Sequence, residues 1–307
     1  MLLTRPNPNP LLRRLHLARP QVKQEVLDHY EVAGPDYAYW SRAFNMHFGY
    51  FAWGMNPFKL EPMLERMNAE ALDRLGLPEE QESLIGDLGC GLGATSRYAA
   101  RRFGAATVLG FTVVPWQVEQ GNQLHEAAGL DDQAHVFQGD FRALPLPDNS
   151  LDGVVALESS CYGTGEDKAD FLAEVYRVLK PGGRFVVADV FRKHSKPLPG
   201  LIARAHRQLS KFWAFPGLAV RDRWLERTQS LGFTEVKAEE ISWKVAPSVM
   251  HVPKTIVKFV WDYWKTHRKV GIARERWEHV KASFLCIVLG LARPHIGYYF
   301  MSGRKPA

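Results

Sequence analysis

The chain is poor in cysteine. Its 307 residues include only three, Cys90, Cys161 and Cys286, which lie far apart and form no CxxC pair. This spacing argues against a disulfide framework and against a thiolate zinc site. The sequence also lacks a recognisable Ser-His-Asp set and a cluster of metal ligands. We therefore expect no metal ion and a reducing compartment, by default the cytoplasm.

Long apolar runs are missing as well. The longest candidate, FLCIVLGLA at 284–292, is far shorter than the ~20 residues that a membrane-spanning helix needs. The first 20 residues are basic, but Pro and Arg interrupt every apolar run before it reaches the length of a signal peptide. We expect a flexible basic tail at 1–20 and a soluble protein that makes at most peripheral contact with a membrane.

The positive charge is not gathered in one long basic run. The net charge is +6, but Lys and Arg are interleaved with acids such as Glu65 and Glu79. Scattered charge is weak support for nucleic-acid binding, so we expect no nucleic-acid partner. A hydrophobic content of 46% and an aromatic content of 12% are typical of a globular protein with an apolar pocket.

Short apolar runs alternate with amphipathic stretches, a pattern that is typical of βαβ units around a parallel sheet. The expected strands are 83–89, 107–113, 135–140, 151–159, 183–191, 234–243 and 295–305. The expected helices of this core are 94–104, 115–130, 167–180 and 221–233. We predict an α/β fold with a doubly wound sheet of seven strands, mostly parallel, whose last strand is antiparallel.

Two segments outside this alternation are rich in aromatic residues. We expect both to form a helical cap, the first at 21–80 and the second as an insertion at 245–293. The core between them covers 81–244, and a final strand and tail occupy 294–307. Within the insertion, 254–269 has apolar residues at helical spacing with Lys and Arg around them, which fits a cap helix better than a membrane-surface helix.

A glycine-rich turn, DLGCGLG at 87–93, follows the first expected strand and opens a helix. Its glycines, Gly89, Gly91 and Gly93, allow a ligand to approach the backbone closely. A dinucleotide fingerprint would read GxGxxG, whereas these glycines alternate and Asp87 precedes them by two residues. This spacing favours S-adenosyl-L-methionine, and we assign these residues and Cys90 to its site.

The chain here resembles the class I methyltransferases, over about residues 37–305. More narrowly, it is similar to the branch that contains sterol C-methyltransferases, tocopherol methyltransferases and cyclopropane-fatty-acid synthases. The resemblance implies a Rossmann-like methyltransferase fold that binds S-adenosyl-L-methionine.

Two further strand ends carry the resemblance. The segment GFTVVPWQ at 110–117 is similar to the GxTLSxxQ of that branch, which implies that Thr112 and Gln117 contact the cofactor. The segment GDFRALPLPDNSLDGV resembles one in which an acid accepts a hydrogen bond from the adenine amino group and the next side chain packs on the ring. These roles would fall to Asp140 and Phe141, although Asp140 could instead cap a turn.

Methyl transfer from a sulfonium is an in-line displacement, so its main demand is to align donor and acceptor in a dry pocket. His47 and Tyr50, in FNMHFGYF, and Glu158, in ALESSCYG, are candidates for accepting a proton from the substrate. Both segments resemble short segments of the same branch. Each residue has a structural alternative as a packing residue or a helix cap. We assign Tyr39 and Trp264 to the walls of the substrate pocket.

The sequence thus predicts an enzyme that methylates an apolar small molecule, most plausibly an isoprenoid- or sterol-like acceptor at carbon. One alternative is an O- or N-methyltransferase that acts on a phenol, sugar or alkaloid. Another is a regulatory module that binds the cofactor without turnover. Cyclopropanation is less favoured, because residues 158–165 lack a clear match to the carbonate-binding pattern of those synthases.

Overall fold

The computed structural model describes residue 15, residues 24–266 and residues 271–307. The strands are β1 (Ser83–Leu88), β2 (Ala106–Thr112), β3 (Ala134–Gln138), β4 (Leu151–Leu157), β5 (Leu179–Arg192), β6 (Ala219–Val220), β7 (Thr234–Glu240) and β8 (Ile296–Arg304). The helices of the core are α3 (Leu60–Leu75), α4 (Ala94–Arg102), α5 (Pro115–Ala127), α6 (Ala169–Val178) and α8 (Arg221–Ser230). Apart from Leu15, the expected tail at 1–20 lies outside the described residues.

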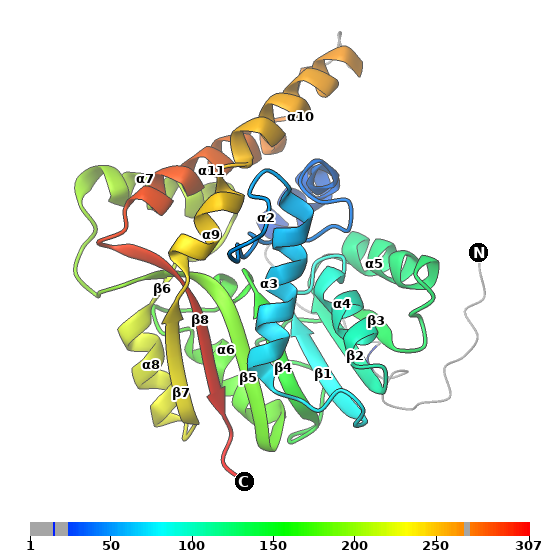
Figure 1. Ribbon diagram of the computed structural model, residues 1–307. Coiled ribbons are helices and arrows are strands. Elements are labelled where there is room, and N and C mark those ends of the chain that lie inside the picture. The colour runs from blue at the N-terminus through cyan, green and yellow to red at the C-terminus, as the bar shows by residue number, and fades with distance from the viewer. Residues whose placement is uncertain (1–14, 16–23, 267–270) are drawn as a thin grey trace.

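The strands form one sheet in the order β3-β2-β1-β4-β5-β8-β7, with β6 beside the end of β5 (Figure 1). The pairs from β3 to β5 are parallel, and β8 is antiparallel to both of its neighbours. The prediction of a doubly wound, mostly parallel sheet with an antiparallel last strand is confirmed. The short β6 was not expected, since its two residues carry no periodic signal.

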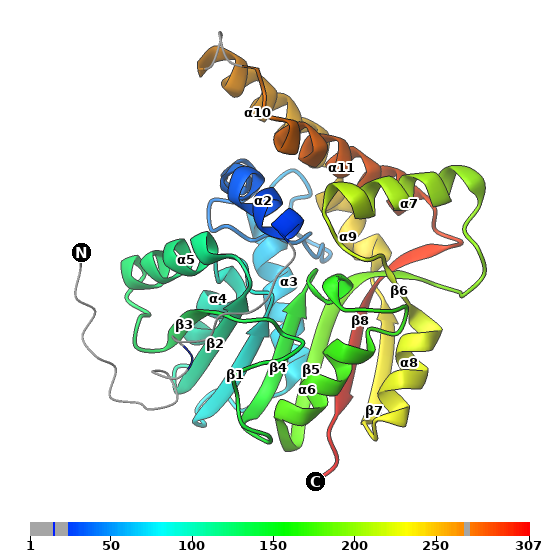
Figure 2. The ribbon, with the colours of Figure 1, turned by 180° about the vertical axis from the view of Figure 1, so that it is seen from behind.

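Helices cover both faces of the sheet, which is why its inner strands are apolar on both sides. On β4, Val154 and Ala156 face the core under α6 and α8, whereas Val155 and Leu157 face the core under α3 and α4. Figures 1 and 2 show these two layers from opposite sides. Side chains therefore alternate between the two faces of the sheet, and helices pack on both faces. Residues at the ends of these strands are held in place by both layers of helices.

The cap lies over the carboxyl ends of the parallel strands (Figure 2). It consists of α2 (Gln24–Ala33), η1 (Gly34–Tyr39), α7 (Gly200–Phe212), α9 (Ser242–Val249), α10 (Val252–Thr266) and α11 (Arg274–Leu291). A separate apolar cluster joins α7 to α11, with Ala205, Leu209, Ala282 and Leu289 at its centre. Helices α10 and α11 and most of α9 lie within the segment 245–293, and α7 from the expected core packs on α11.

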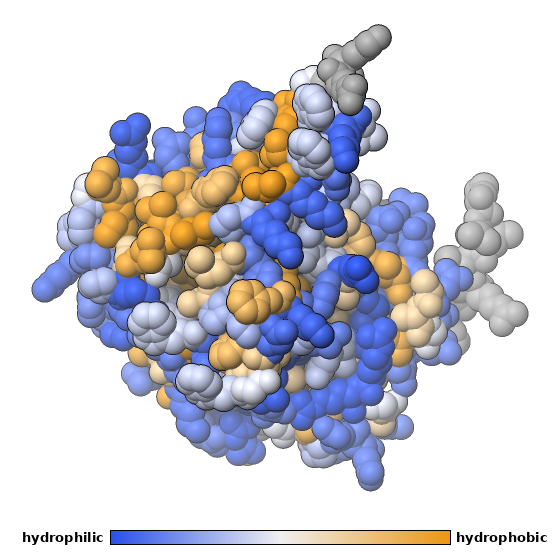
Figure 3. Space-filling model, turned by 45° about the horizontal axis from the view of Figure 1, so that its top comes forward, coloured by the Kyte–Doolittle hydropathy of each residue, from blue (hydrophilic) through white to orange (hydrophobic). Residues whose placement is uncertain are grey.

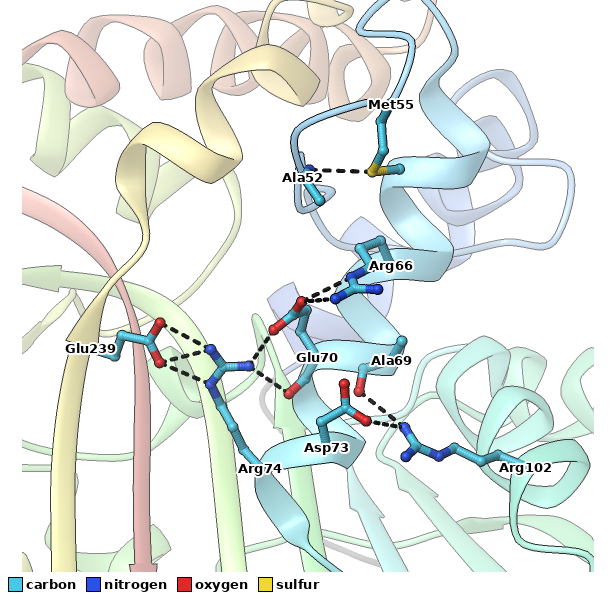
Figure 4. Close-up of polar contacts among 9 residues, drawn as sticks. All are labelled: Ala52, Met55, Arg66, Ala69, Glu70, Asp73, Arg74, Arg102 and Glu239. Carbon is cyan, nitrogen blue, oxygen red and sulfur yellow. Dashed lines mark hydrogen bonds and ion pairs between the residues drawn. The ribbon is translucent and has the colours of Figure 1, made fainter.

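The expected N-terminal cap segment divides in two. While α2 and η1 lie in the cap, α3 covers the sheet, because Met67, Leu72 and Leu75 on one of its faces are buried against the core. Charged residues then anchor α3: Arg74 contacts Glu70 one turn away at 2.6 Å and reaches across to Glu239 of β7 at 2.7 Å (Figure 4). Segment 21–80 thus contributes to both the cap and the core.

Within the part of the chain that the structure describes, no helix is long and apolar enough to cross a membrane.

Candidate active site

Three cavities meet beside the ends of β1 and β4, where the order of the strands reverses. Open α/β sheets bind their ligands at such a point. We call the cavity along the ends of β1 to β4 the cleft, the one beneath η1, α10 and α11 the aromatic chamber, and the one beneath α7, α9 and α11 the apolar chamber. Met46 and Glu158 line all three cavities, so these two residues mark their junction.

The cleft brings together most of the residues that the sequence assigned to the cofactor. Those that line it are Asp87, Gly89, Cys90, Gly91, Thr112, Gln117, Asp140 and Phe141. They lie in or after the last residues of three strands, β1, β2 and β3, that are neighbours in the sheet. Gly93 does not line the cleft.

Each glycine of the turn after β1 is required by its surroundings. All three have φ between +55° and +78°, the left-handed region that disfavours other residues. A Cβ on Gly89 would lie 2.3 Å from Cβ of Ser159, and one on Gly91 would lie 2.7 Å from Sδ of Met46. A Cβ on Gly93, the N-cap of α4, would lie 2.4 Å from Nε2 of His125. Gly89 and Gly91 thus shape the cleft, and Gly93 lets α4 pack on α5.

A buried carboxyl group stands at the floor of this turn. Asp87 is 2% exposed and accepts a hydrogen bond from Oγ of Ser96 at 2.7 Å. Burial raises the pKa of Asp87 from 3.8 to about 6. The neighbouring thiol of Cys90 also has its pKa raised by burial, so it is neutral and unreactive at physiological pH.

The wall after β2 is held by a side-chain hydrogen bond. Oγ1 of Thr112 donates to Oε1 of Gln117 at 2.6 Å, and Nε2 of Gln117 lies 3.8 Å from Sδ of Met46. Pro115 at the start of α5 fixes the turn between them. Thr112 and Gln117 therefore hold each other's side chains in place at the edge of the cleft.

The wall after β3 combines an acid with an aromatic ring. Asp140 forms an ion pair with Arg142 at 2.5 Å and also accepts a hydrogen bond from the backbone N–H of Arg142 at 2.9 Å. The ring of Phe141 is 8% exposed and meets Phe171 edge to face, with centroids 5.2 Å apart. Asp140 thus both lines the cleft and closes its own turn, and its contact with the adenine stays a prediction.

Glu158 follows β4 and is the buried acid at the junction. Its Oε1 accepts hydrogen bonds from the backbone N–H of Phe48 at 2.6 Å and from the hydroxyl of Tyr298 at 2.8 Å. Its φ is +52°, in the left-handed region. Burial raises the pKa of Glu158 from 4.5 to about 8, although both hydrogen bonds favour the charged form. A small change in nearby charge would therefore change its protonation at physiological pH.

His47 lines the cleft and the aromatic chamber, but its ring is engaged by the protein. Nδ1 lies 2.9 Å from the carbonyl oxygen of Phe48, and Nε2 lies 3.1 Å from Oδ1 of Asn68. Thr95 and Asn45 bind the same Asn68 amide, at 2.8 Å each. Burial lowers the pKa of His47 to about 4. This geometry suits a residue that positions the segment around 44–51 better than one that accepts a proton.

The remaining predicted residues fall in three different places. Tyr39 lines the aromatic chamber and meets Phe259 edge to face at 5.5 Å. Tyr50 lies outside the linings of the three cavities, where its ring packs near Phe300. Trp264 is 53% exposed on α10 and also lies outside these linings.

The apolar chamber is lined mainly by aromatic and aliphatic side chains, whereas the aromatic chamber combines such side chains with polar ones, among them Asp36, Thr255, Arg276, His279 and Ser283. The aromatic chamber is lined by Tyr37, Tyr39, Trp40, Phe48, Trp213, Ile256 and Phe259, among others. The apolar chamber is lined by Leu209, Phe215, Leu218, Val245, Val249, Ile287, Leu289 and Ile296, among others. The chambers therefore suit an apolar molecule.

Sequence reasoning missed two features of this junction. Tyr298, which donates a hydrogen bond to Glu158, lies in β8; the strand was expected, but this contact was not. Tyr30 and Tyr162 line both the cleft and the apolar chamber, and their hydroxyls lie 2.9 Å apart. Tyr162 in turn donates to the carbonyl of Trp213. Because these partners are more than 50 positions apart in the chain, no local motif signals them.

A family model described as a methyltransferase domain matches residues 85–183, which hold the turn after β1 and the ends of β2, β3 and β4. The cyclopropane synthase MmaA2 from Mycobacterium tuberculosis has a similar fold, with a TM-score of 0.75 at 18% identity over 92% of this chain and 98% of that structure. These matches support the α/β core and its cleft.

Two curated relatives extend the similarity. The S-adenosyl-L-methionine-dependent Diels-Alderase iccD of Talaromyces variabilis is 30% identical over 85% of this chain and 87% of its own length. The cycloartenol-C-24-methyltransferase of Arabidopsis thaliana is 33% identical over 53% of this chain. The match spans 46% of that plant protein, less than half of its length.

Proposed function

Because this chain belongs to the S-adenosylmethionine-dependent methyltransferases, we propose that it transfers the methyl group to a carbon atom of an isoprenoid- or sterol-like molecule. The observation that carries this proposal is the position of Glu158. Its buried carboxyl group lies where the cofactor cleft joins two chambers with aromatic and aliphatic walls. The similarity to a sterol C-24-methyltransferase supports the same acceptor class.

The cleft fits the cofactor in its shape and in its donor set. The turn after β1 has no side chains at Gly89 and Gly91, so a ligand can approach its backbone beside α4. Two acids, Asp87 and Asp140, line opposite ends of the cleft. We assign the turn and Asp87 to the amino-acid part, Thr112 and Gln117 to the middle, and Asp140 with Phe141 to the adenine. When bound, S-adenosylmethionine supplies an electrophilic methyl group.

The acceptor chemistry follows from the junction. The electron pair of an alkene in the acceptor would form the bond to the methyl group as the methyl–sulfur bond breaks, and the neighbouring carbon would become a cation. Aromatic faces such as those of Tyr39 and Phe48 stabilise such a cation. Glu158 then takes a proton from the adjacent carbon, and the C–H electron pair restores a double bond. Because Glu158 lines the cleft assigned to the cofactor, a positive charge held there would lower the pKa of its carboxyl group and favour the charged form that accepts a proton.

The test is to incubate the purified protein with methyl-labelled donor and a panel of sterols, prenyl diphosphates, prenylated quinols and simple phenols. We expect label on carbon in an isoprenoid or sterol product. The Glu158→Gln variant should bind S-adenosylhomocysteine with unchanged affinity in calorimetry but lose turnover. Label found only on oxygen or nitrogen would overturn the carbon assignment and favour the O- or N-methyltransferase alternative.

A second candidate function is cyclisation of a bound polyene without methyl transfer. It is favoured by the 30% identity, over most of both chains, to a relative named as a Diels-Alderase. The largely apolar linings of the two chambers could fold a flexible substrate as well as shield a cation. Mass spectrometry of the product separates the two: methyl transfer adds one carbon, whereas cyclisation gives an isomer of unchanged mass. Cofactor binding without either product would indicate a regulatory module.

A further inference from the structure

The outer side of the cap carries an exposed apolar surface, which we call the cap face. Its members come from α10, α11 and both ends of α9: Trp243, Met250, Val257, Trp261, Trp264, Trp277, Phe284, Val288 and Leu291. Several are largely exposed, including Trp243 at 76% and Leu291 at 77%. Figure 3 shows apolar side chains gathered in a band over this part of the molecule.

The exposed apolar residues of α10 and α11 recur at the spacing of one face of a helix. On α10, Val257, Trp261 and Trp264 recur at intervals of four and three residues, and on α11 Phe284, Val288 and Leu291 do the same. The opposite sides of these helices already bury Phe259 and Leu289 inside the cap. Packing of the cap therefore explains the inner apolar sides of both helices, whereas their outer sides are exposed in the part of the chain that the structure describes.

The segment that carries most of this apolar surface is rich in basic residues. Residues 242–293 contain ten Lys or Arg against three Asp or Glu, so this segment alone is more positive than the whole chain, whose net charge is +6. Two cations lie on tryptophans of the cap face: Lys265 is 5.0 Å from the ring of Trp261, and Arg293 is 4.3 Å from that of Trp243. Tryptophan beside Lys or Arg is typical of protein segments at a membrane interface.

The apolar chamber opens through this surface. Trp243, Met250 and Leu291 line the chamber and are also exposed members of the cap face. At its other end the chamber is lined by Glu158 and Tyr298. A continuous apolar path thus runs from the cap face to the junction, and an apolar molecule that follows it avoids exposure to water.

We propose that the cap face docks on the surface of an anionic lipid membrane and that the acceptor reaches the apolar chamber directly from the lipid. Apolar stripes would enter the interface while the Lys and Arg residues contact negative headgroups. A second copy of the chain fits less well, because a symmetric pair would bring two strongly positive surfaces together. The docking proposal depends only on the residues of the cap face, whereas the proposed path of the acceptor rests on the proposed function.

The test measures sedimentation of the protein with vesicles of phosphatidylcholine, with and without phosphatidylserine. We expect binding to the anionic vesicles that weakens at high salt. The double variant Lys258→Glu with Lys265→Glu should reduce this binding at least about tenfold. Trp261→Ser with Leu291→Ser should reduce it without changing the net charge. The control Arg223→Glu with Lys237→Glu makes the same charge change on α8 and β7, away from the cap, and should retain most of the binding.

Calorimetric titration with S-adenosylhomocysteine verifies that each variant keeps a folded cleft. The docking proposal is overturned if wild-type protein does not bind anionic vesicles, or if the control variant loses binding as much as the cap variants. A dimer that the Trp261→Ser, Leu291→Ser variant dissociates, without vesicle binding, would assign the cap face to a second copy instead. Failure of the proposed function is seen separately, as vesicle binding without methyl transfer to carbon.

Discussion

The cleft and the chambers are built in opposite ways, although they share Glu158 and Met46. The cleft takes its assigned cofactor residues from a short part of the chain, 87–141, where they lie at the ends of β1, β2 and β3 or a few residues beyond them. The chambers draw their walls from η1, α7, α9, α10, α11 and β8, which are spread over nearly the whole chain. The difference indicates that the cofactor site is a property of the core, whereas the acceptor site is a property of how the cap is placed on it.

The largest expected effect lies at the point that both regions share. Glu158→Gln keeps the size of the side chain and its acceptor oxygen but cannot take a proton. We expect kcat to fall by about 10²–10⁴, measured with the acceptor identified in the labelling screen. Unchanged affinity for S-adenosylhomocysteine would assign Glu158 to the chambers; a matching loss of cofactor affinity would assign it to the cleft.

Next in size is a change confined to the cleft. Gly89→Ala introduces a Cβ that would lie 2.3 Å from Cβ of Ser159, at a φ of +78°. We expect the affinity for S-adenosylhomocysteine to fall by roughly a hundredfold, or about 3 kcal/mol. Adding Ser159→Gly removes the clashing atoms and should restore part of the affinity. No loss in the single variant would show that the turn can move without disturbing the site.

A smaller effect is expected at the far end of the cleft. Asp140→Ala should weaken cofactor binding by roughly 1–3 kcal/mol, if its carboxylate accepts a hydrogen bond from the adenine. Because Arg142 loses its partner as well, Arg142→Ala serves as the control and should cost less than Asp140→Ala. Equal losses in calorimetry for the two variants would mean that Asp140 acts only by closing its turn.

The pH dependence of stability should also distinguish the two regions. Burial raises the pKa of Asp87 to about 6 and that of Glu158 to about 8. A carboxyl group with a raised pKa in the folded state favours the fold at low pH, and this contribution is lost as the pH rises to the folded pKa. Thermal unfolding should show Asp87→Asn gaining stability relative to wild type between pH 4 and 6, and Glu158→Gln gaining it up to about pH 8. If the stability of each variant changed with pH in parallel with that of wild type, the raised pKa values of Asp87 and Glu158 would both be contradicted.

The smallest effect is expected outside both regions. Tyr50→Phe should leave kcat and cofactor affinity within about twofold, since its ring packs near Phe300 and lines none of the three cavities. A steady-state assay beside wild type tests this. A loss of kcat comparable to that of Glu158→Gln would show that the hydroxyl of Tyr50 takes part in the reaction, and that the acceptor site extends to Tyr50.

The sequence predicted the core well because its signals are local. A glycine turn, a strand end and the helix that follows lie within a few residues of each other, so the motif carries the geometry. One boundary was misplaced: the strand expected at 183–191 begins at Leu179, and Pro181, Gly182 and Gly183 lie inside it. They form an irregular stretch of β5, which pairs with β4 at Leu179 and again from Arg184.

The acceptor site was harder to predict because periodicity does not say which face of a helix turns inward. The stripe in 254–269 suggested that Trp264 faces the substrate, but α10 is apolar on two sides. Phe259 takes the inner side, and Trp264 lies on the outer one. The sequence also does not say which tyrosine reaches Glu158. Tyr50 was the candidate tyrosine for the reaction, but the position of β8 in the sheet brings Tyr298 to Glu158 instead.

The left-handed backbone of Glu158 limits how the acceptor site can be altered by engineering. Asn and Asp tolerate this conformation better than Glu does, so a random library would tend to favour them at position 158 for stability. Either side chain is one methylene shorter, and would stop short of the Phe48 N–H and the Tyr298 hydroxyl that orient the carboxylate. Selection for thermal stability and selection for turnover should therefore pull this position toward different residues.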